Sequence, residues 1–397
     1  MRLYDHQIQA LKNSEGLNRV AYYHDMGLGK TFTGAEKMHR LGAKVNLVIC
    51  QKSKINDWVD HFKTYYPDYH VFDMTDKTKA GKRAYNAIML NIKHGTNVPC
   101  ILIINYELAF RRAELADLHG FTLMLDESSL IQNETAKRSK FALKLGDNAD
   151  NIILLSGTPT SGKYENLWSQ MHLLGWNISK RMYWNQYINV EYMDMLGRSI
   201  PIVKGYKNVD RLKRKMRNYG CQFLLTDEVF NLPEQIYQTI TIDSTKEYRM
   251  FKDNGIVKVD DTELIGDTTL TKMLYERMLC AIYNPAKYEA FRDLLNSTED
   301  NFIVFYNFNE ELENLKTVAN ACDRVYSVIN GTVKDKVNYS LNHNFILFIQ
   351  YQAGARGGNY QTIASRLIFS SLPLSSELFE QSKISSFPKL PTLISVK

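Results

Sequence analysis

The sequence predicts an α/β protein made of two doubly wound domains, each with a parallel sheet covered by helices. Short apolar runs rich in Val, Ile and Leu alternate with longer amphipathic segments along most of the 397 residues, and this alternation is typical of parallel sheets. The length and the 44% content of hydrophobic residues allow two or three cores, because a single core rarely exceeds about 250 residues. A single small binding module is therefore not expected.

The apolar runs divide the chain into a first domain of residues 1–175 and a second domain of residues 236–397. Between them, residues 176–235 are rich in Tyr and charge, and we expect a helical insertion or linker there. The runs expected as strands of the first sheet are "RVAYYH", "VNLVIC", "HVFDM", "CILIINY", "FTLMLD" and "NIILLS". Those of the second are "QIYQTITID", "NFIVFYNF", "RVYSVI", "NFILFIQY" and "SRLIFSS". In such folds ligands bind at the carboxyl ends of the strands.

Composition favours an intracellular protein that handles polyanions. The net charge of +6, with 24 Tyr and 18 Phe, suits such a surface. Five scattered cysteines form neither a CxxC pair nor a disulfide ladder. We find no leader and no apolar run long enough for a membrane span, so we predict a cytoplasmic location with no signal peptide and no membrane partner. The basic run "RLKRKMR" at residues 211–217 is either a DNA contact or a solvated helix face, and we favour the second interpretation.

The segment "HDMGLGKTFTG", residues 24–34, predicts a phosphate-binding loop between a strand and a helix. Gly27 and Gly29 allow the backbone N–H groups to face a phosphate. Lys30 then reaches the β and γ phosphates, and the hydroxyl of Thr31 is a ligand for magnesium. His24 stands where the generic P-loop pattern has its first glycine, so the strict pattern fails at one residue.

Two further strand ends carry candidate catalytic residues. In "LMLDESSLIQN" an apolar run delivers Asp126 to hold magnesium and Glu127 to orient and deprotonate the attacking water. An Asp-Glu pair alone is more typical of a helix N-cap, but together with the P-loop it indicates nucleotide hydrolysis. In "LLSGTP", Ser156 and Thr158 are candidates to sense the γ-phosphate or to link the carboxylates to the partner domain, although this segment alone indicates only a turn.

Four segments resemble, in their order along the chain, the motifs of Swi/Snf-type DNA translocases of helicase superfamily 2. They are "YDHQ" (4–7), "DMGLGKT" (25–31), "LDESSLIQN" (125–133) and "SGTP" (156–159). The resemblance extends to about residue 382. Further segments that carry it are "LVICQKSKINDWVDHF" (motif Ia), "IINYELA" (motif Ib), "NLWSQMHLLGW", "EVFNLPEQIYQ", "NPAKYEAFRDLL", "VFYNFNEEL" (motif IV) and "QAGARGGNY" (motif V). It implies two RecA-like domains that hold ATP and Mg²⁺ and step along double-stranded DNA.

The resemblance also implies further site residues. Gln7, with Arg2 beside it, matches the residue that reads adenine. Gly354 and Gly357 of the motif V segment would let the backbone approach nucleotide and DNA, although an ordinary glycine turn is the alternative. The departures are Ser128 and Ser129, where Ala-His or Ala-Gln is common, and Arg356, where an acidic residue is common. The short two-domain layout is similar to bacteriophage members.

Motif VI of this family is a helix of pattern Gln-x-x-Gly-Arg-x-x-Arg. If Gln381 is its first residue, the two arginines fall on Ser385 and Pro388. We therefore expect a second domain that is truncated at its C-terminus, with residues 383–397 a poorly packed, non-native tail. Loss of an arginine finger lowers turnover by about 10³ to 10⁵.

Two functions remain open at this stage. The first is an enzyme, a DNA-dependent ATPase that translocates on duplex DNA. The second is a hydrolysis-deficient fragment that still binds ATP and DNA. A third, an RNA helicase of the same superfamily, is less favoured because the Leu-Ile-Gln-Asn sequence at residues 130–133 is similar to the DNA translocase branch.

Overall fold

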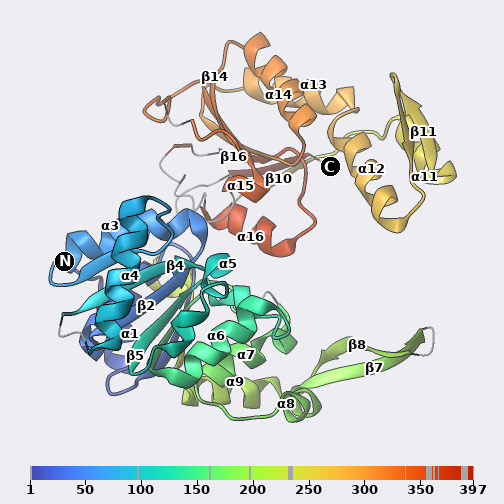
Figure 1. Cartoon of the computed structure of the whole chain (residues 1–397). Helices are drawn as coiled ribbons and strands as arrows, with labels where there is room; N and C mark the ends of the chain where they lie inside the picture. Colours follow the sequence, from blue (N-terminus) through green and yellow to red (C-terminus); the bar gives the residue numbers. More distant parts are fainter. Residues whose placement is uncertain are drawn as a thin grey trace. The chain divides into compact units, whose positions relative to one another are not determined.

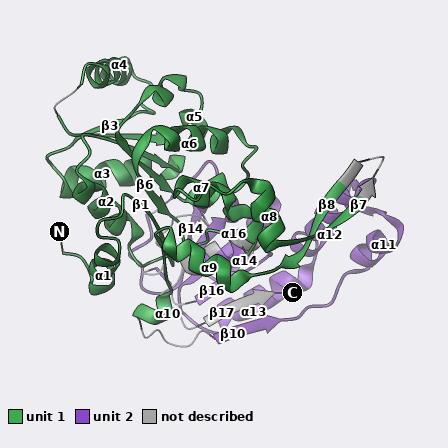
Figure 2. Ribbon diagram, turned by 90° about the horizontal axis from the view of Figure 1, so that it is seen from below, with its two compact units in different colours: residues 1–230 green, residues 231–397 purple. Residues whose placement is uncertain are grey.

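The computed structural model describes residues 2–95, 98–160, 162–195, 198–230, 236–335, 337–354, 360, 363–364, 366–385 and 392–396. The chain forms two compact units, residues 1–230 and residues 231–397 (Figure 2). The predicted α/β class with two parallel sheets is confirmed. Within the ranges described, no helix combines the length and the apolarity that a membrane crossing requires.

The sheet of the first unit has the strand order β3-β4-β2-β5-β6-β1-β9 within the described residues, and every neighbouring pair is parallel. Its strands are β1 (Arg19–His24), β2 (Val45–Cys50), β3 (His70–Asp73), β4 (Cys100–Asn105), β5 (Phe121–Asp126), β6 (Ala149–Leu155) and β9 (Cys221–Leu224). All six predicted runs are strands. Because the strands are parallel, the carboxyl ends of β1, β5 and β6 lie at the same edge of the sheet.

Helices cover both faces of this sheet (Figure 1). Alternate side chains of the strands enter two separate apolar cores, so that Val20 and Tyr22 pack on one face and Ala21 and Tyr23 on the other. The first face is covered by α1 (Asp5–Asn13), α2 (Lys30–Leu41) and α3 (Ile55–Tyr65). The second is covered by α4 (Lys79–Lys93), α5 (Tyr106–Ala109), α6 (Lys137–Asn148), α7 (Trp168–Leu173), α8 (Lys180–Tyr187) and α9 (Val209–Asn218). Short 3-10 helices are η1 (Lys52–Lys54), η2 (Ala113–Asp117), η3 (Ser128–Ile131) and η4 (Tyr164–Leu167).

The structure of residues 176–235 differs from the helical insertion or linker that we expected from the sequence. Through residue 230 it belongs to the first unit, and between α8 and α9 it forms an antiparallel hairpin of β7 (Ile188–Met195) and β8 (Arg198–Tyr206). The hairpin extends away from the rest of the unit (Figure 1). After α9 the chain adds β9 beside β1 and continues through α10 (Thr226–Val229). The boundary between the units therefore lies at residues 230 and 231.

The second unit has a parallel sheet of order β10-β17-β16-β13-β15-β14 within the described residues. The strands are β10 (Ile236–Ile240), β13 (Phe302–Tyr306), β14 (Val325–Ile329), β15 (Phe345–Gln350), β16 (Arg366–Phe369) and β17 (Thr392–Val396). Its helices are α11 (Lys246–Asn254), α12 (Thr269–Ala281), α13 (Pro285–Asn296), α14 (Asn309–Ala321), α15 (Tyr351–Gly354) and α16 (Ser376–Ser385). A separate antiparallel ribbon pairs β11 (Ile256–Val259) with β12 (Thr262–Ile265), and α11 and α12 pack against it in a small core of their own.

Part of the expected tail at residues 383–397 lies within this sheet. Strand β17 pairs in parallel with β10 on one side and with β16 on the other, so its backbone groups are satisfied by two neighbours. The backbone of Gln381 and Ser385 belongs to α16. Pro388 lies outside the described residues.

Candidate functional site

The P-loop segment forms the predicted turn between β1 and α2. Gly27 and Gly29 have φ of 82° and 70°, a left-handed region that glycine enters without the steric cost of a Cβ. Helix α2 begins at Lys30, and Thr31 is its second residue. The first turn of a helix has backbone N–H groups without intrahelical partners, so this turn directs donors and the positive end of the helix dipole toward an anion.

Lys30 is held by the backbone of the same loop. Its Nζ donates to the carbonyl oxygens of His24 at 2.9 Å and Asp25 at 3.2 Å. Burial lowers the pKa of Lys30, and the carboxylates of Glu127, Asp126 and Asp25 raise it in opposition. The ammonium therefore lies within the electrostatic range of the acidic pair.

The acidic pair lies at the end of β5. Asp126 ends the strand, and Glu127 follows with φ 55° and ψ 57°. A non-glycine residue in this left-handed conformation is strained by about 1–3 kcal/mol, and such strain concentrates at functional sites. Burial raises the pKa of Asp126, while its hydrogen bond with Trp58 and the charge of Lys30 act in the opposite direction.

Two aromatic side chains hold the acidic pair. The indole Nε1 of Trp58 donates to Oδ2 of Asp126 at 2.8 Å. The hydroxyl of Tyr106 donates to the carbonyl oxygen of Asp126 at 2.9 Å, with a longer contact of 3.4 Å to that of Glu127. We did not predict either residue, although both lie in segments noted above for their resemblance to motifs Ia and Ib.

The "SGTP" segment lies beside the P-loop. A Cβ added at Gly157 would lie 3.5 Å from Nζ of Lys30 and 3.6 Å from the carbonyl oxygen of His24. Ser156 is buried, and its Oγ accepts a hydrogen bond from the backbone N–H of Thr158 at 3.3 Å. Within the described part of the chain, the buried Oγ1 of Thr158 has no hydrogen-bond partner.

Gln170 connects this segment to the acidic pair. Its side chain is fully buried, accepts hydrogen bonds from Ser128 Oγ at 2.8 Å and Tyr23 Oη at 3.0 Å, and donates to the carbonyl oxygen of Pro159 at 2.8 Å. Ser128 therefore has a partner within the first unit. Sequence reasoning did not single out Gln170, although it lies in the segment "NLWSQMHLLGW" noted above for its resemblance.

The two residues proposed for adenine lie in different surroundings. Gln7 is buried, and its Nε2 donates to the carbonyl oxygens of Leu28 at 3.3 Å and Gly29 at 3.2 Å, so it contacts the P-loop directly. Arg2 is exposed and lines a separate hollow of about 730 Å³ together with Glu36 and Arg40.

A cavity of about 470 Å³ lies at the carboxyl ends of β1 and β9. Its wall includes Tyr4, His6 and Phe230. The His6 ring is stacked on Tyr4 with centroids 5.9 Å apart, and it meets Phe230 edge-on at 5.9 Å. His24 lines the same cavity, and burial lowers its pKa to about 4. These rings offer an aromatic surface for a flat base beside the P-loop.

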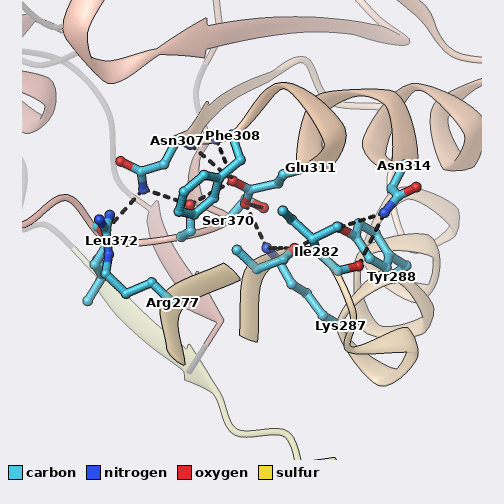
Figure 3. Close-up of polar contacts among 12 residues, drawn as sticks. Arg277, Ile282, Lys287, Tyr288, Asn307, Phe308, Glu311, Asn314, Ser370 and Leu372 are labelled. Atoms are coloured by element: carbon cyan, nitrogen blue, oxygen red, sulfur yellow. Dashed lines mark hydrogen bonds and ion pairs between the residues drawn. The ribbon is translucent and has the colours of Figure 1, made fainter. Parts of the chain in front are cut away.

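The second unit contains the remaining predicted residues. Gly354 is buried, and a Cβ there would overlap the side chain of Ile349, so packing alone requires glycine at this position. Gly357 and Arg356 lie outside the described residues. A buried ion pair of Lys287 and Glu311 lies in a polar cluster at the carboxyl ends of β13 and β16 (Figure 3).

The first unit offers oxygen ligands suited to magnesium. No group of three or more His, Cys, Asp and Glu that would cage a metal occurs among the described residues. Magnesium is usually held by one or two carboxylates together with substrate phosphates, so such a cage is not required. Asp126 supplies one carboxylate at the end of β5, and Thr31, the second residue of α2, supplies a hydroxyl oxygen, so the residue types present are suitable for a magnesium–nucleotide complex.

The fold and this site define an α/β protein with a P-loop and an acidic strand end in its first unit. A family model described as "SNF2-related domain" matches residues 18–286, more than half of the chain. The chain belongs to this family.

Individual relatives share part of the chain. It is 25% identical over 183 residues to mouse "SWI/SNF-related matrix-associated actin-dependent regulator of chromatin subfamily A member 1", covering 43% of this chain and 17% of that protein. It is 30% identical over 161 residues to "Helicase SWR1" of Mycosarcoma maydis, covering 38% of this chain and 8% of that protein. The matches thus span less than a fifth of these relatives. The solved "Sulfolobus solfataricus SWI2/SNF2 ATPase core in complex with dsDNA" aligns at 16% identity and a TM-score of 0.48, covering 100% of this chain and 88% of that one.

Proposed function

We propose that the protein is an ATP-dependent motor that hydrolyses ATP and tracks along duplex DNA. One observation carries this proposal. The P-loop lysine, the Asp126–Glu127 pair and the "SGTP" turn lie near one another at one edge of the first sheet. Membership of the SNF2-related family supports it independently.

Each residue has a role that follows from its position. The backbone N–H groups after Gly29 and the ammonium of Lys30 bind the phosphates and stabilise the charge that develops on them. Glu127, fixed by the backbone at the end of β5, orients the attacking water and accepts its proton. Gln7 and the cavity lined by Tyr4 and His6 receive the base. Mg²⁺, held by Asp126 and Thr31, would neutralise charge on the β and γ phosphates.

The nucleotide part of the proposal is tested with Lys30→Ala. This variant should lose ATP binding or turnover with little loss of stability, because the lysine serves the loop and not an apolar core. Lys37→Met is the matched control, since Lys37 is buried, lies on the same helix and also donates to a backbone carbonyl oxygen, that of Ser14 at 2.7 Å. A nucleotide titration of Lys30→Ala that matches the unsubstituted chain would refute the P-loop assignment.

The DNA part is tested by salt dependence. Affinity for a duplex should fall steeply as salt rises, because backbone phosphates dominate contacts of tracking proteins. Joint replacement of Arg211, Lys213 and Arg214 on α9 by Gln should leave the slope unchanged if that exposed face is only solvated. A reduction of the slope by about 0.9 per lost phosphate contact would make α9 part of the DNA surface. Flat affinity between low and physiological salt would contradict duplex tracking.

A second candidate function is binding of ATP and DNA with little hydrolysis. It is favoured by Ser385 and Pro388, which stand where the motif VI register calls for arginine. Loss of such a charge lowers turnover by about 10³ to 10⁵. Steady-state ATP hydrolysis with and without duplex decides between the two, since DNA-stimulated turnover within tenfold of a relative that carries both motif VI arginines would exclude this second function.

A further inference from the structure

The side chain of Trp58 is fixed by its apolar surroundings, independently of its hydrogen bond to the acidic pair. Its side chain is only 1% exposed and belongs to the apolar core on the α3 face of the sheet, together with Val48, Ile103 and Met124. The indole is stacked on Phe62 with ring centroids 5.5 Å apart and planes inclined by 24°. A ring confined in this way directs its single N–H group at one place, which is Oδ2 of Asp126 at 2.8 Å.

The opposite face of the sheet supplies a second contact to the same strand end. Tyr106 is 2% exposed and belongs to the core on the α5 face. Its hydroxyl donates to the carbonyl oxygen of Asp126 at 2.9 Å. The carboxylate of Asp126 is therefore held from one face and its backbone from the other.

A hydrogen bond to an ionised carboxylate is stronger and more directional than one between neutral groups. For Asp126 the alternative partners near the P-loop include the ammonium of Lys30, which attracts the carboxylate electrostatically. The hydrogen bond from Trp58 fixes one carboxylate oxygen and therefore opposes rotation of the carboxylate toward that lysine. The contact thus favours one orientation of the side chain.

We propose that Trp58 is a positioning residue that orients the Asp126 carboxylate to receive the magnesium of the magnesium–nucleotide complex. The proposal rests on the function proposed above and assigns Trp58 a task that its apolar environment alone does not require. Partners that orient a metal ligand typically contribute about 10- to 100-fold in metal affinity.

The test compares Trp58→Phe with the unsubstituted chain by calorimetric titration of Mg²⁺ into the complex of protein and ATP. Phenylalanine keeps the stacking on Phe62 and removes the donor. Apparent Mg²⁺ affinity should fall by about 10- to 100-fold, while affinity for ATP in the presence of a chelator stays within about twofold, because the P-loop contacts are unchanged. A merely structural role would instead weaken both affinities together.

Trp168→Phe is the matched control. Trp168, in the same unit, also donates its indole N–H, but to the carbonyl oxygen of Ile178 at 2.8 Å and not to Asp126. Its replacement should leave Mg²⁺ affinity unchanged. Equal Mg²⁺ affinity in Trp58→Phe and the unsubstituted chain would overturn the proposal, as would an equal loss in both tryptophan variants.

A second substitution tests the proposal in case Trp58→Phe does not fold. Benzothienylalanine at position 58 keeps the two-ring shape and replaces N–H by sulfur, so loss of Mg²⁺ affinity with this residue supports the proposal and retention overturns it. If the unsubstituted chain binds neither ATP nor Mg²⁺–ATP, the proposed function itself has failed. Binding by that chain with no effect at position 58 removes the positioning role alone.

Discussion

Lys287 and Glu311 form a buried ion pair in the second unit, with Nζ 2.7 Å from Oε1 and side chains 3% and 0% exposed. Burial lowers the pKa of Lys287, and Glu311 raises it in opposition. The carboxylate also accepts hydrogen bonds from the hydroxyls of Ser370 at 2.7 Å and Ser371 at 2.8 Å and from the backbone N–H of Asn307 at 3.0 Å (Figure 3). This pair therefore joins α13 to the ends of β13 and β16.

Lys287→Met should lower the free energy of unfolding by about 3–5 kcal/mol, because it leaves a buried carboxylate without its counter-charge. Lys316→Met is the control, since Lys316 pairs with the exposed Glu313 at 2.8 Å and should cost less than about 1 kcal/mol. Urea unfolding of the two variants measures the difference. Similar losses of unfolding free energy in both variants would contradict the stabilising contribution that we assign to the buried pair.

Gly29→Ala should destabilise the protein more than Gly42→Ala. Both glycines have positive φ, 70° and 68°, so each alanine carries a backbone cost of about 1–2 kcal/mol. A Cβ at Gly29 would also overlap Nε2 of Gln7, whereas one at Gly42 meets nothing within 4 Å. Thermal unfolding measures the excess, which should disappear when Gln7→Ala is added. If Gly29→Ala still lowers stability more than Gly42→Ala when both are made in the Gln7→Ala background, the overlap with Gln7 is not the cause of the difference.

His61 should make the protein less stable as pH falls from 6.5 toward 4. Burial lowers its pKa from 6.5 to about 4, so in this window the unfolded chain binds a proton that the folded chain does not. Stability then falls with decreasing pH by about 1.4 kcal/mol per unit for one such group. His61→Phe should reduce the slope by that amount, while replacement of the exposed His94 by Phe serves as control. Urea titrations at several pH values give the slopes, and identical slopes for His61→Phe and the unsubstituted chain would disprove the assignment.

Gln170→Leu should lower the free energy of unfolding by about 2–4 kcal/mol, because the hydroxyls of Ser128 and Tyr23 lose their shared acceptor inside the protein. Gln9→Leu is a suitable control, since Gln9 is exposed and bonds the exposed side chain of Asn13 across one helical turn at 2.7 Å. That control should stay within about 0.5 kcal/mol. Equal midpoints of chemical unfolding for the two variants would show that the buried contacts contribute little.

The central sheets could be predicted because buried parallel strands are continuous apolar runs. "FTLMLD" is β5 and "VNLVIC" is β2 without a change of boundary. The hairpin of β7 and β8 escaped prediction because its side chains are largely exposed on both faces, as Tyr192 at 68% shows, and its sequence therefore lacks an apolar period. Strand β17 was missed for a different reason, since the motif VI register led us to expect a non-native tail at residues 383–397, where it pairs with β10 and β16.

The candidate site could be predicted only where residues recur in motifs. Lys30, Asp126 and Glu127 follow strands in recognisable patterns, and the structure brings Lys30 within electrostatic range of the acidic pair. Trp58 holds Asp126 through one hydrogen bond across 68 residues of sequence, and Gln170 bonds Ser128 across 42 residues and Tyr23 across 147. Such contacts depend on how two elements pack, which local pattern does not specify.

The contacts of Lys30 also bear on the solvent around the P-loop. Folding has already placed the carbonyl oxygens of His24 and Asp25 against this ammonium, where water molecules would otherwise bind. An arriving phosphate would exchange one set of oxygen acceptors for another, so little dehydration of the cation remains for the moment of binding. The enthalpy of nucleotide capture should therefore depend on rearrangement of the loop backbone more than on release of water from the lysine.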